Sequence, residues 1–427
     1  MIAYHAIVLL IATLTTTTFF PFVKAVTPAD RANHECVILQ STIYCYGGAP
    51  RVPTEAISIV SHTTGLFYTL DLSQEKSVSD LETSWVEYTG QNVGPNNYFA
   101  MVAIPGENSF IIDGGRGGGG QTGPFIKNST VIFNATGDGQ FSTIRDGNHS
   151  VVDSHCGVYD PASNQAFFYG GRKSYEYSGL LGSEGFPDTM PIFDVFRSTW
   201  SLSRSTLRKL TQETRVNHKG VLGNDGNTIY YIGGIYPSAE NPDGSVEYQY
   251  ASMTQILTYN IQESTWGLET TSGLVPSSRI DHSLTLKPST GEIVVYGGSP
   301  MGSGIPVPDY FYILDPGNMV WSNRSINASD DAQGAGARFG HAAVRAGNDT
   351  LFIIFGSTGQ SDSSIHVLDI GSWSWVNKIV GFGSNGQPNT PPGGITPNDP
   401  SSDTSSGVSS GTIAGAVVGA VVGVCFF

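Results

Sequence analysis

The chain has 427 residues and a formal net charge of -15, and 13% of its residues are charged, against about a quarter in typical soluble domains. An acidic surface repels phosphate backbones and anionic lipid head groups, so the composition argues against nucleic acid as a partner. Between the two ends, short apolar runs alternate with turns rich in Gly, Pro, Asn and Asp, and no useful helical pattern interrupts them, which indicates an all-β fold.

The N-terminal residues 1–25 have the pattern of a signal peptide. An uncharged apolar stretch runs from Ile2 to Leu14, and Val23 and Ala25 are small residues at the two positions that a signal peptidase reads. The sequence therefore predicts entry into the secretory pathway and removal of residues 1–25. A retained signal anchor is the alternative, because no Lys or Arg precedes the apolar stretch.

The first predicted hairpin contains a candidate disulfide. If Gln40 and Ser41 form a two-residue turn, Cys36 and Cys45 lie directly opposite each other on the two strands. Opposed residues in a non-hydrogen-bonded pair have Cα atoms about 4.5 Å apart, near the lower edge of disulfide geometry. We therefore expect a Cys36–Cys45 disulfide, which fits an oxidising compartment, and a buried thiol at Cys156.

A short apolar β run that ends in a glycine pair, or its remnant, recurs six times, about every 60 residues. A turn of Gly, Pro, Asn or Asp precedes the run, which predicts an antiparallel hairpin. After a loop of variable length, a hydrophobic residue with Asp or Asn and then a large aromatic indicate two further strands. The first glycines of the six runs are assigned as Gly47, Gly114, Gly170, Gly233, Gly297 and Gly356.

Three residue types return at fixed places in these units. A histidine precedes the glycines in five units, at His34, His155, His218, His282 and His341, usually with Arg three residues earlier. The late aromatic is Trp85, Trp200, Trp266, Trp321 or Trp375, and the second unit departs with Asn96, Phe99 and Phe141. Because a residue type repeated in five units cannot mark one asymmetric reaction centre, we expect these side chains to complete packing or hydrogen bonds within each unit.

The β run closed by Gly-Gly and followed by a spaced Trp resembles the kelch repeat, and the resemblance covers residues 28–380. It implies a six-bladed β-propeller with four antiparallel strands per blade, similar to the secreted or membrane-anchored kelch proteins of fungi, which have galactose-oxidase-like propellers. The chain starts on a first strand and ends on a fourth, so the sequence does not show how such a ring closes.

Repeat symmetry is broken by two long loops between the second and third strands of repeats three and four, residues 172–191 and 235–253. Function in a propeller usually depends on such loops, and tyrosine provides rigid contact area with a polar tip for a protein or a sugar. Solvated loops that pack on themselves are the alternative. The candidate ligand-binding residues are Tyr175, Tyr177, Phe186, Tyr236, Glu247, Tyr248 and Tyr250.

Six Asn-x-Ser/Thr triplets are candidate N-glycosylation sites: Asn128, Asn134, Asn148, Asn323, Asn327 and Asn348. The kelch resemblance implies that the loops joining consecutive blades share a face with the long loops. Glycans at Asn128, Asn148, Asn323 and Asn327 would then cover blades two, five and six. Blades three and four carry no acceptor, so their aromatic and acidic loops would remain accessible.

The composition changes after Trp375. Residues 381–410 are Gly, Ser, Pro, Thr and Asn with almost no charge, which predicts a disordered stalk. Residues 411–427 are wholly apolar but shorter than the about 20 residues of a typical membrane span. They match either a glycolipid attachment signal, with small residues near 402–407, or a short transmembrane helix, and both predict attachment to the cell surface.

These observations favour a non-catalytic surface protein that binds an extracellular protein or a carbohydrate and needs no cofactor or metal. The alternative is a copper-radical carbohydrate or alcohol oxidase of the galactose oxidase type, which uses two tyrosines, two histidines and a cysteine crosslinked to a tyrosine. After the predicted disulfide, Cys156 is the only cysteine of the mature protein left for that crosslink, and the adjacent Tyr-His pair of that family occurs only at Tyr4 and His5, inside the predicted signal peptide. An intracellular adaptor, a role of many kelch proteins, is disfavoured by the predicted signal.

Overall fold

The computed structural model describes residues 25–50, 63–88, 94–117, 130–137, 139–144, 151–173, 185–208, 211–327 and 332–389. The chain divides into two units, Met1–Asn389 and Thr390–Phe427, and all described residues belong to the first. Residues 1–24 of the predicted signal peptide, most of the predicted stalk and the whole apolar tail lie outside the described residues. Within the described part, no helix has the length and hydrophobicity needed to cross a membrane.

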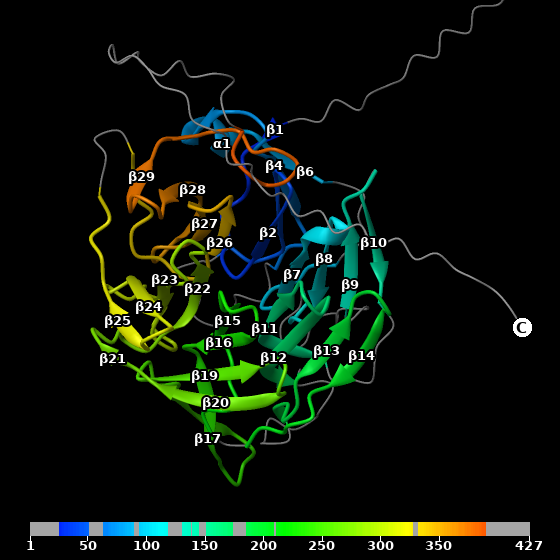
Figure 1. Ribbon diagram of the computed structural model, residues 1–427, viewed down its shortest axis with the longest axis vertical. Coiled ribbons are helices and arrows are strands. Elements are labelled where there is room, and N and C mark those ends of the chain that lie inside the picture. Colours follow the sequence, from blue (N-terminus) through cyan, green and yellow to red (C-terminus); the bar gives the residue numbers. More distant parts are fainter. Residues whose placement is uncertain are drawn as a thin grey trace, which may run out of the picture. The chain divides into compact units, whose positions relative to one another are not determined.

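Six sheets, each built on four antiparallel strands of one repeat, follow one another around a ring in chain order, which confirms the predicted six-bladed β-propeller (Figure 1). Blade 1 contains β2 (Glu35–Leu39), β3 (Thr42–Tyr46), β4 (Phe67–Asp71) and β6 (Trp85–Glu87), with β1 (Ala25–Val26) at its outer edge. Blade 2 contains β7 (Ala100–Ile104), β8 (Ser109–Asp113), β9 (Thr130–Asn134) and β10 (Gln140–Thr143), with a short 3-10 helix at Pro105–Glu107. Blade 3 contains β11 (Val152–Asp160), β12 (Gln165–Lys173), β13 (Pro191–Asp194) and β14 (Thr199–Leu202).

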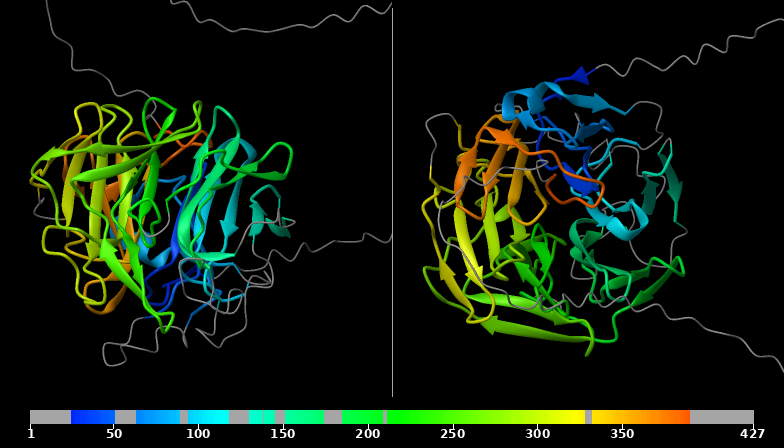
Figure 2. Two further views of the ribbon diagram at one scale, coloured as in Figure 1. Left: turned by 90° about the horizontal axis from the view of Figure 1, so that it is seen from below. Right: turned by 45° about the horizontal axis from the view of Figure 1, so that its top comes forward.

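The other three blades continue the ring in the same order, and blades 4 and 5 each carry an addition to it (Figure 2). Blade 4 contains β15 (Lys219–Leu222), β16 (Thr228–Ile232), β19 (Gln255–Asn260) and β20 (Thr265–Thr270), and between β16 and β19 it carries a separate hairpin of β17 (Ile235–Glu240) and β18 (Val246–Tyr250). Blade 5 contains β22 (Ile280–Leu286), β23 (Ile293–Ser299), β24 (Phe311–Asp315) and β25 (Val320–Ser322), with β21 (Ser272–Gly273) at its outer edge. Blade 6 contains β26 (Ala342–Ala346), β27 (Thr350–Ser357), β28 (Ser361–Asp369) and β29 (Ser374–Val376).

The apolar core lies between the blades. Each neighbouring pair of blades shares one cluster of buried side chains; for example, Ile232 and Ile256 of blade 4 pack with Val295 and Trp321 of blade 5. All residues of β8 and β23 are buried, because a central strand has a neighbouring blade against each of its faces. This burial explains why the second strand of each repeat is a nearly continuous apolar run.

The spaced aromatics occupy one slot of the blade, as the repeat predicts. In four blades the tryptophan lies directly opposite the hydrophobic residue of the third strand, and the pairs are Phe193 with Trp200, Tyr259 with Trp266, Leu314 with Trp321, and Leu368 with Trp375. Trp321 is buried, and its Nε1 donates to the Met253 carbonyl oxygen at 2.9 Å. The slot is therefore part of the blade scaffold.

The glycine pair permits close contact between blades. Gly170 has a φ of 76°, and a Cβ added there would lie 2.4 Å from the Arg215 carbonyl oxygen and 2.5 Å from His218 Cε1, both in the next segment of the ring. The repeated histidines were expected to complete packing within each blade. In the structure, the Cβ of His218 packs against Gly234 of its own blade, and its ring also packs against Gly170 of the preceding blade, because the first strands of neighbouring blades converge at the axis.

The sequence predicts Gly356 as the first glycine of repeat six, but the structure has the preceding residue at that place. Phe355, with a φ of 56°, and not Gly356, takes the place of the first glycine. Its carbonyl oxygen accepts from Arg338 Nη1 at 2.8 Å, as the Gly297 carbonyl oxygen accepts from Arg279 Nη1 at 3.1 Å. A bulge between Ile354 and Gly356 shifts the register, and the His34 ring lies 5.1 Å from the Phe355 ring, so this seam accommodates a side chain.

The ring closes between blades 6 and 1 by apolar packing and a small strand pair. Buried residues of both blades, among them Leu70 and Ile365, form one cluster. An insertion in blade 1 supplies β5 (Lys76–Ser77) and α1 (Val78–Thr83), and β5 pairs with β30 (Lys378–Ile379). Phe382 is also buried and its N–H donates to the Leu72 carbonyl oxygen at 2.9 Å. The compact unit thus continues to Asn389, beyond the predicted propeller end at residue 380.

The first hairpin has the register that the sequence predicts. Cys36 lies opposite Cys45 with a Cα–Cα distance of 4.1 Å, and the two form a disulfide. Cys156 is a buried free thiol on β11, with Sγ 3.1 Å from His218 Nε2. Burial raises the pKa of the Cys156 thiol, which disfavours the reactive thiolate.

Candidate functional site

A ring of backbone hydrogen bonds surrounds the propeller axis. The residue before each axial His or Phe has a φ between 54° and 62°, and these residues are Asn33, Tyr98, Ser154, Asn217, Asp281 and Gly340. N–H groups in this set donate to carbonyl oxygens of the preceding blade: Ser154 to Tyr98 at 2.7 Å, Asn217 to Ser154 at 2.8 Å, and Asn33 to Gly340 at 2.8 Å. The left-handed backbone turns each N–H toward the preceding blade, so these bonds fix the inner rim.

The axial channel is largely filled by side chains. Glu35 of blade 1 and Lys219 of blade 4 form an ion pair across the axis, because these two blades face each other in a six-membered ring. Burial lowers the pKa of Lys219, but Glu35 together with weaker contributions from Cys156 and Asp281 raises it by more, so Lys219 stays charged. The remaining cavity measures about 40 Å³, enough for a few water molecules.

All five axial histidines are buried, and four of them are neutral. Burial lowers the pKa of His34, His218 and His341 well below its usual value, and burial with the positive charges of Arg279 and Lys219 lowers that of His282 to about 3. His155 Nε2 is 3.0 Å from Asp113 Oδ2 of the preceding blade. These contacts agree with a scaffold role between blades.

We expect the free energy of unfolding to decrease as the pH falls below about 6.5, the pKa of a histidine in the unfolded chain. Below that pH, histidines of the unfolded chain bind protons, whereas the buried histidines of the folded protein do not. The His282→Phe variant carries the residue type that blade 2 has at Phe99. Between pH 6.5 and 4, its free energy of unfolding should decrease less than that of the unchanged protein, by as much as about 3 kcal/mol. Urea titrations of both proteins at several pH values measure this difference. The contributions of Asp and Glu to the pH dependence cancel in the comparison, because both proteins have the same carboxylates. Equal pH dependence of the two proteins would show that His282 is not held neutral.

The residues around Cys156 do not fit the copper site of the oxidase alternative. Among the described residues, no group of three His, Cys, Asp or Glu side chains could hold a metal ion. The buried tyrosines that share its apolar cluster have protein partners: the Tyr169 hydroxyl donates to the Glu213 carbonyl oxygen, and the Tyr231 hydroxyl lies 3.4 Å from Met190 Sδ. The oxidase alternative therefore has no structural support.

Blades 2 and 3 place a charged cluster beside the inner rim. Arg116 and Arg172, each directly after a glycine pair, both approach Asp153 Oδ1 through Nε, at 3.1 Å and 3.2 Å. The Arg116 guanidinium also lies 4.3 Å from the centre of the Tyr98 ring. Burial lowers the pKa of Arg116, but Asp153 and Tyr98 raise it by more. The one signal for this cluster in the sequence is that Arg follows the glycines in repeats two and three, where the other repeats have Ala, Ile or Ser.

The hairpin β17–β18 is the most prominent departure from the repeat. On its inner side, Ile235 and Val246 pack with the buried Phe186 and Val216, and the rings of Phe186 and Tyr248 are 6.2 Å apart. On its outer side, Glu247 and Gln249 are exposed, and the Tyr236 hydroxyl donates to Gln249 Oε1 at 2.9 Å.

Tyr248 connects the hairpin to the charged cluster. Burial and the negative charge of Asp153 raise the pKa of Tyr248 to about 12, while Arg116 acts in the opposite direction. Both charges of the Arg116–Asp153 pair therefore act on this side chain of the hairpin.

The structure brings together four of the seven candidate ligand-binding residues. Tyr236, Glu247, Tyr248 and Tyr250 lie on one hairpin. Phe186 is only 4% exposed and packs against the inner side of the hairpin, so it is not available for contact with a ligand. Tyr175 and Tyr177 lie outside the described residues.

Two exposed apolar residues next to this hairpin were not identified from the sequence. Met301 is 40% exposed and Ile305 is 65% exposed, in the loop between β23 and β24 of blade 5. The Met301 N–H donates to the Tyr250 hydroxyl at 2.5 Å, which ties this loop to β18. The only signal in the sequence is an apolar pair inside a loop of Gly, Ser and Pro.

Four predicted glycosylation acceptors have exposed side chains in the structure: Asn134, Asn323, Asn327 and Asn348. Asn128 and Asn148 lie outside the described residues. Whether glycans cover blades two, five and six stays a prediction.

The comparisons with known proteins agree with the topology. A comparison with curated proteins found no match to this chain. Residues 162–391, more than half of the chain, match the family described as the KLHDC2/KLHL20/DRC7 Kelch-repeats domain. The match begins in blade 3, and blades 1 and 2, which precede it, contain the same succession of four antiparallel strands. The glycine pairs, the spaced tryptophans, the six blades and this match together show that the chain belongs to the kelch-repeat family.

Proposed function

We propose that this propeller is a non-catalytic binding protein whose partner contacts the hairpin β17–β18. Kelch propellers generally act in protein interactions, and this chain supplies a rigid ring with a raised and partly exposed hairpin. The observation that carries the proposal is the gathering of Tyr236, Glu247, Tyr248 and Tyr250 on that hairpin, beside the Arg116–Asp153 pair. Half-buried tyrosines at a rigid site bind partners with little loss of conformational entropy.

We further propose that the partner is extracellular and that this protein is attached to the cell surface. The support is the signal-like segment at residues 1–25, the Cys36–Cys45 disulfide, and the apolar tail at residues 411–427. A protein is the favoured ligand because of the kelch fold, and a carbohydrate is the second class that a tyrosine surface suits.

Arrays of extracellular proteins and glycans, probed with the full-length chain, test the proposal. We expect the Tyr236→Ala variant to bind its array ligand about tenfold more weakly, since tyrosines near an interface centre are frequent hot spots. Tyr159→Ala is the matched control: Tyr159 is also half-buried, and its hydroxyl also donates to a side-chain amide, Asn164 Oδ1 at 2.7 Å, but at the opposite end of a blade. Unchanged binding by Tyr236→Ala, or equal loss in both variants, would refute the placement of the site.

A further inference from the structure

The surface of blade 4 is acidic along its whole length. No Lys or Arg occurs between Lys219 and Arg279, whereas this segment contains six acidic residues: Asp225, Glu240, Asp243, Glu247, Glu263 and Glu269. Three of these, Glu240, Asp243 and Glu247, belong to the hairpin and its turn, and all three are exposed. Hydrogen bonds from Ser245 lower the pKa of Asp243, so this carboxylate is ionised at neutral pH.

An apolar pair lies beside this acidic hairpin. Met301 and Ile305 are two of the large hydrophobic residues that remain exposed in the described part of the chain. Their loop is held at both sides: the Met301 N–H donates to Tyr250, and the Val307 N–H donates to the Gly298 carbonyl oxygen at 2.9 Å. A fixed loop that exposes apolar side chains next to a charged strand is typical of an interaction surface.

We propose that the hairpin β17–β18 and the loop of residues 300–306 form one docking surface for a cationic segment of a partner protein. This inference rests on the proposed function and specifies its partner. Lys or Arg side chains of the segment face Glu247 and Asp243, and apolar side chains of the same segment cover Met301 and Ile305. Opposite charge also accelerates association, because the long-range field of the acidic blade attracts a cationic partner.

Other occupants fit this surface less well. Nucleic acid is repelled by the negative charge. A metal ion is disfavoured, since no group of three carboxylates in the described residues could hold one. A simple polyamine would satisfy the charges but would leave Met301 and Ile305 uncovered. Only a polypeptide offers cationic and apolar side chains at fixed spacing.

Fluorescence anisotropy with the full-length protein tests this inference directly. Three short labelled peptides serve as probes: alternating Lys and Leu, alternating Glu and Leu, and alternating Lys and Ser. We expect the Lys/Leu peptide to bind most tightly, and its affinity to fall when the ionic strength rises from about 0.01 to about 0.15 M, because salt screens the charges. Equal binding of the Glu/Leu peptide, or no binding of the Lys/Leu peptide, overturns the inference.

Two matched pairs of variants locate the contact. Glu247→Lys and Glu263→Lys change the net charge equally, and both glutamates are exposed on blade 4, but Glu263 lies in the turn between β19 and β20 at the other end of the sheet. Ile305→Ser is paired with Phe196→Ser, which replaces a residue that is 83% exposed in the turn between β13 and β14. We expect about tenfold weaker binding for Glu247→Lys and for Ile305→Ser, and less than about twofold change for the two controls. Equal effects within either pair overturn the inference.

The variants distinguish a failure of this inference from a failure of the proposed function. If Tyr236→Ala weakens binding of an array ligand while Glu247→Lys and Ile305→Ser leave it unchanged, the hairpin binds a partner that is not cationic. If Tyr236→Ala has no effect, the hairpin is not the binding site and both proposals fail. Thermal unfolding of each variant shows that the fold is intact, since all the exchanged side chains lie at least partly on the surface.

Discussion

Replacing Gly170 by alanine should lower the free energy of unfolding by about 3 to 5 kcal/mol. Two costs add at this position. Its φ of 76° is unfavourable for any residue with a Cβ, and that Cβ would lie 2.4 Å from the Arg215 carbonyl oxygen and 2.5 Å from His218 Cε1. The carbonyl cannot move freely, because it accepts from the Gly171 N–H at 2.7 Å. Urea denaturation of the variant measures the loss.

Gly244→Ala is the matched control for this variant. Gly244 has a φ of 80° in the turn between β17 and β18, and an added Cβ would meet no atom within 4 Å. Its replacement should cost only the conformational part, about 1 to 2 kcal/mol. The difference between the two variants therefore measures the contact between blades 3 and 4. If both variants lose the same stability, the close approach of the histidine to the glycine does not stabilise the ring.

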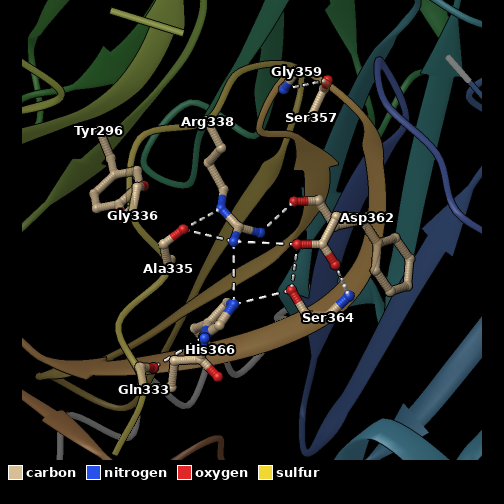
Figure 3. A network of polar contacts seen from close by, with 11 residues as sticks. Tyr296, Gln333, Ala335, Gly336, Arg338, Ser357, Gly359, Asp362, Ser364 and His366 are labelled. Atoms are coloured by element: carbon tan, nitrogen blue, oxygen red, sulfur yellow. Dashed lines mark hydrogen bonds and ion pairs between the residues drawn. The ribbon is translucent and has the colours of Figure 1, made fainter. Parts of the chain in front are cut away.

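Replacing Arg338 by methionine should cost about 3 to 5 kcal/mol, because the change leaves several buried groups without their donor. Figure 3 shows the network around this residue. The guanidinium donates to the carbonyl oxygens of Ala335 and Phe355, at 2.6 to 2.9 Å, and lies 3.4 Å from the Asp362 carboxylate. Burial lowers the pKa of Arg338, an effect that Asp362 opposes.

His366 makes this network specific for a donor at position 338. Its Nδ1 donates to the Gln333 carbonyl oxygen at 3.0 Å, so its Nε2 carries no proton and accepts from Arg338 Nη2 at 3.1 Å. Methionine fills a similar volume but donates to none of these acceptors. Urea denaturation gives the loss of stability relative to the unchanged protein.

Arg197→Met is the control for the loss of an Arg–Asp pair. Arg197 Nη1 is 2.6 Å from Asp194 Oδ2, but the arginine side chain is 72% exposed. A pair in this environment should contribute less than about 1 kcal/mol, because water and salt screen it. A similar loss for both variants would show that the carbonyl contacts of Arg338 add nothing to its ion pair.

Much of the fold followed from local sequence signals. The turn at Gln40 and Ser41 fixed which residues face each other on the first hairpin, and the structure has Cys36 opposite Cys45 as expected. The fixed spacing of the tryptophans likewise predicted one slot in each repeat, and the structure has Trp321 opposite Leu314 in that slot. These paired residues lie only a few positions apart in the sequence. Once one pair is fixed, the alternation of side chains along the two strands determines the other pairs.

The candidate site was predicted only in part. Four residues of the hairpin β17–β18 were identified because a long aromatic loop stands out against a repeat. The approach of Arg116 to Asp153, and of Met301 to Tyr250, joins different blades. Neither contact has a sequence pattern, since each depends on how neighbouring blades are oriented around the axis.

The sequence by itself determined the number of blades, the strands within each blade and the loops that differ, because hydrophobic alternation, turn residues and the repeat period act locally. Only the tertiary structure decided what happens between blades. It placed His218 against Gly170, gave Phe355 the first glycine's position in repeat six, and closed the ring with β5, β30 and Phe382. The physical reason is distance along the chain: these contacts join residues from different repeats, and they form only when all six blades share one closed ring.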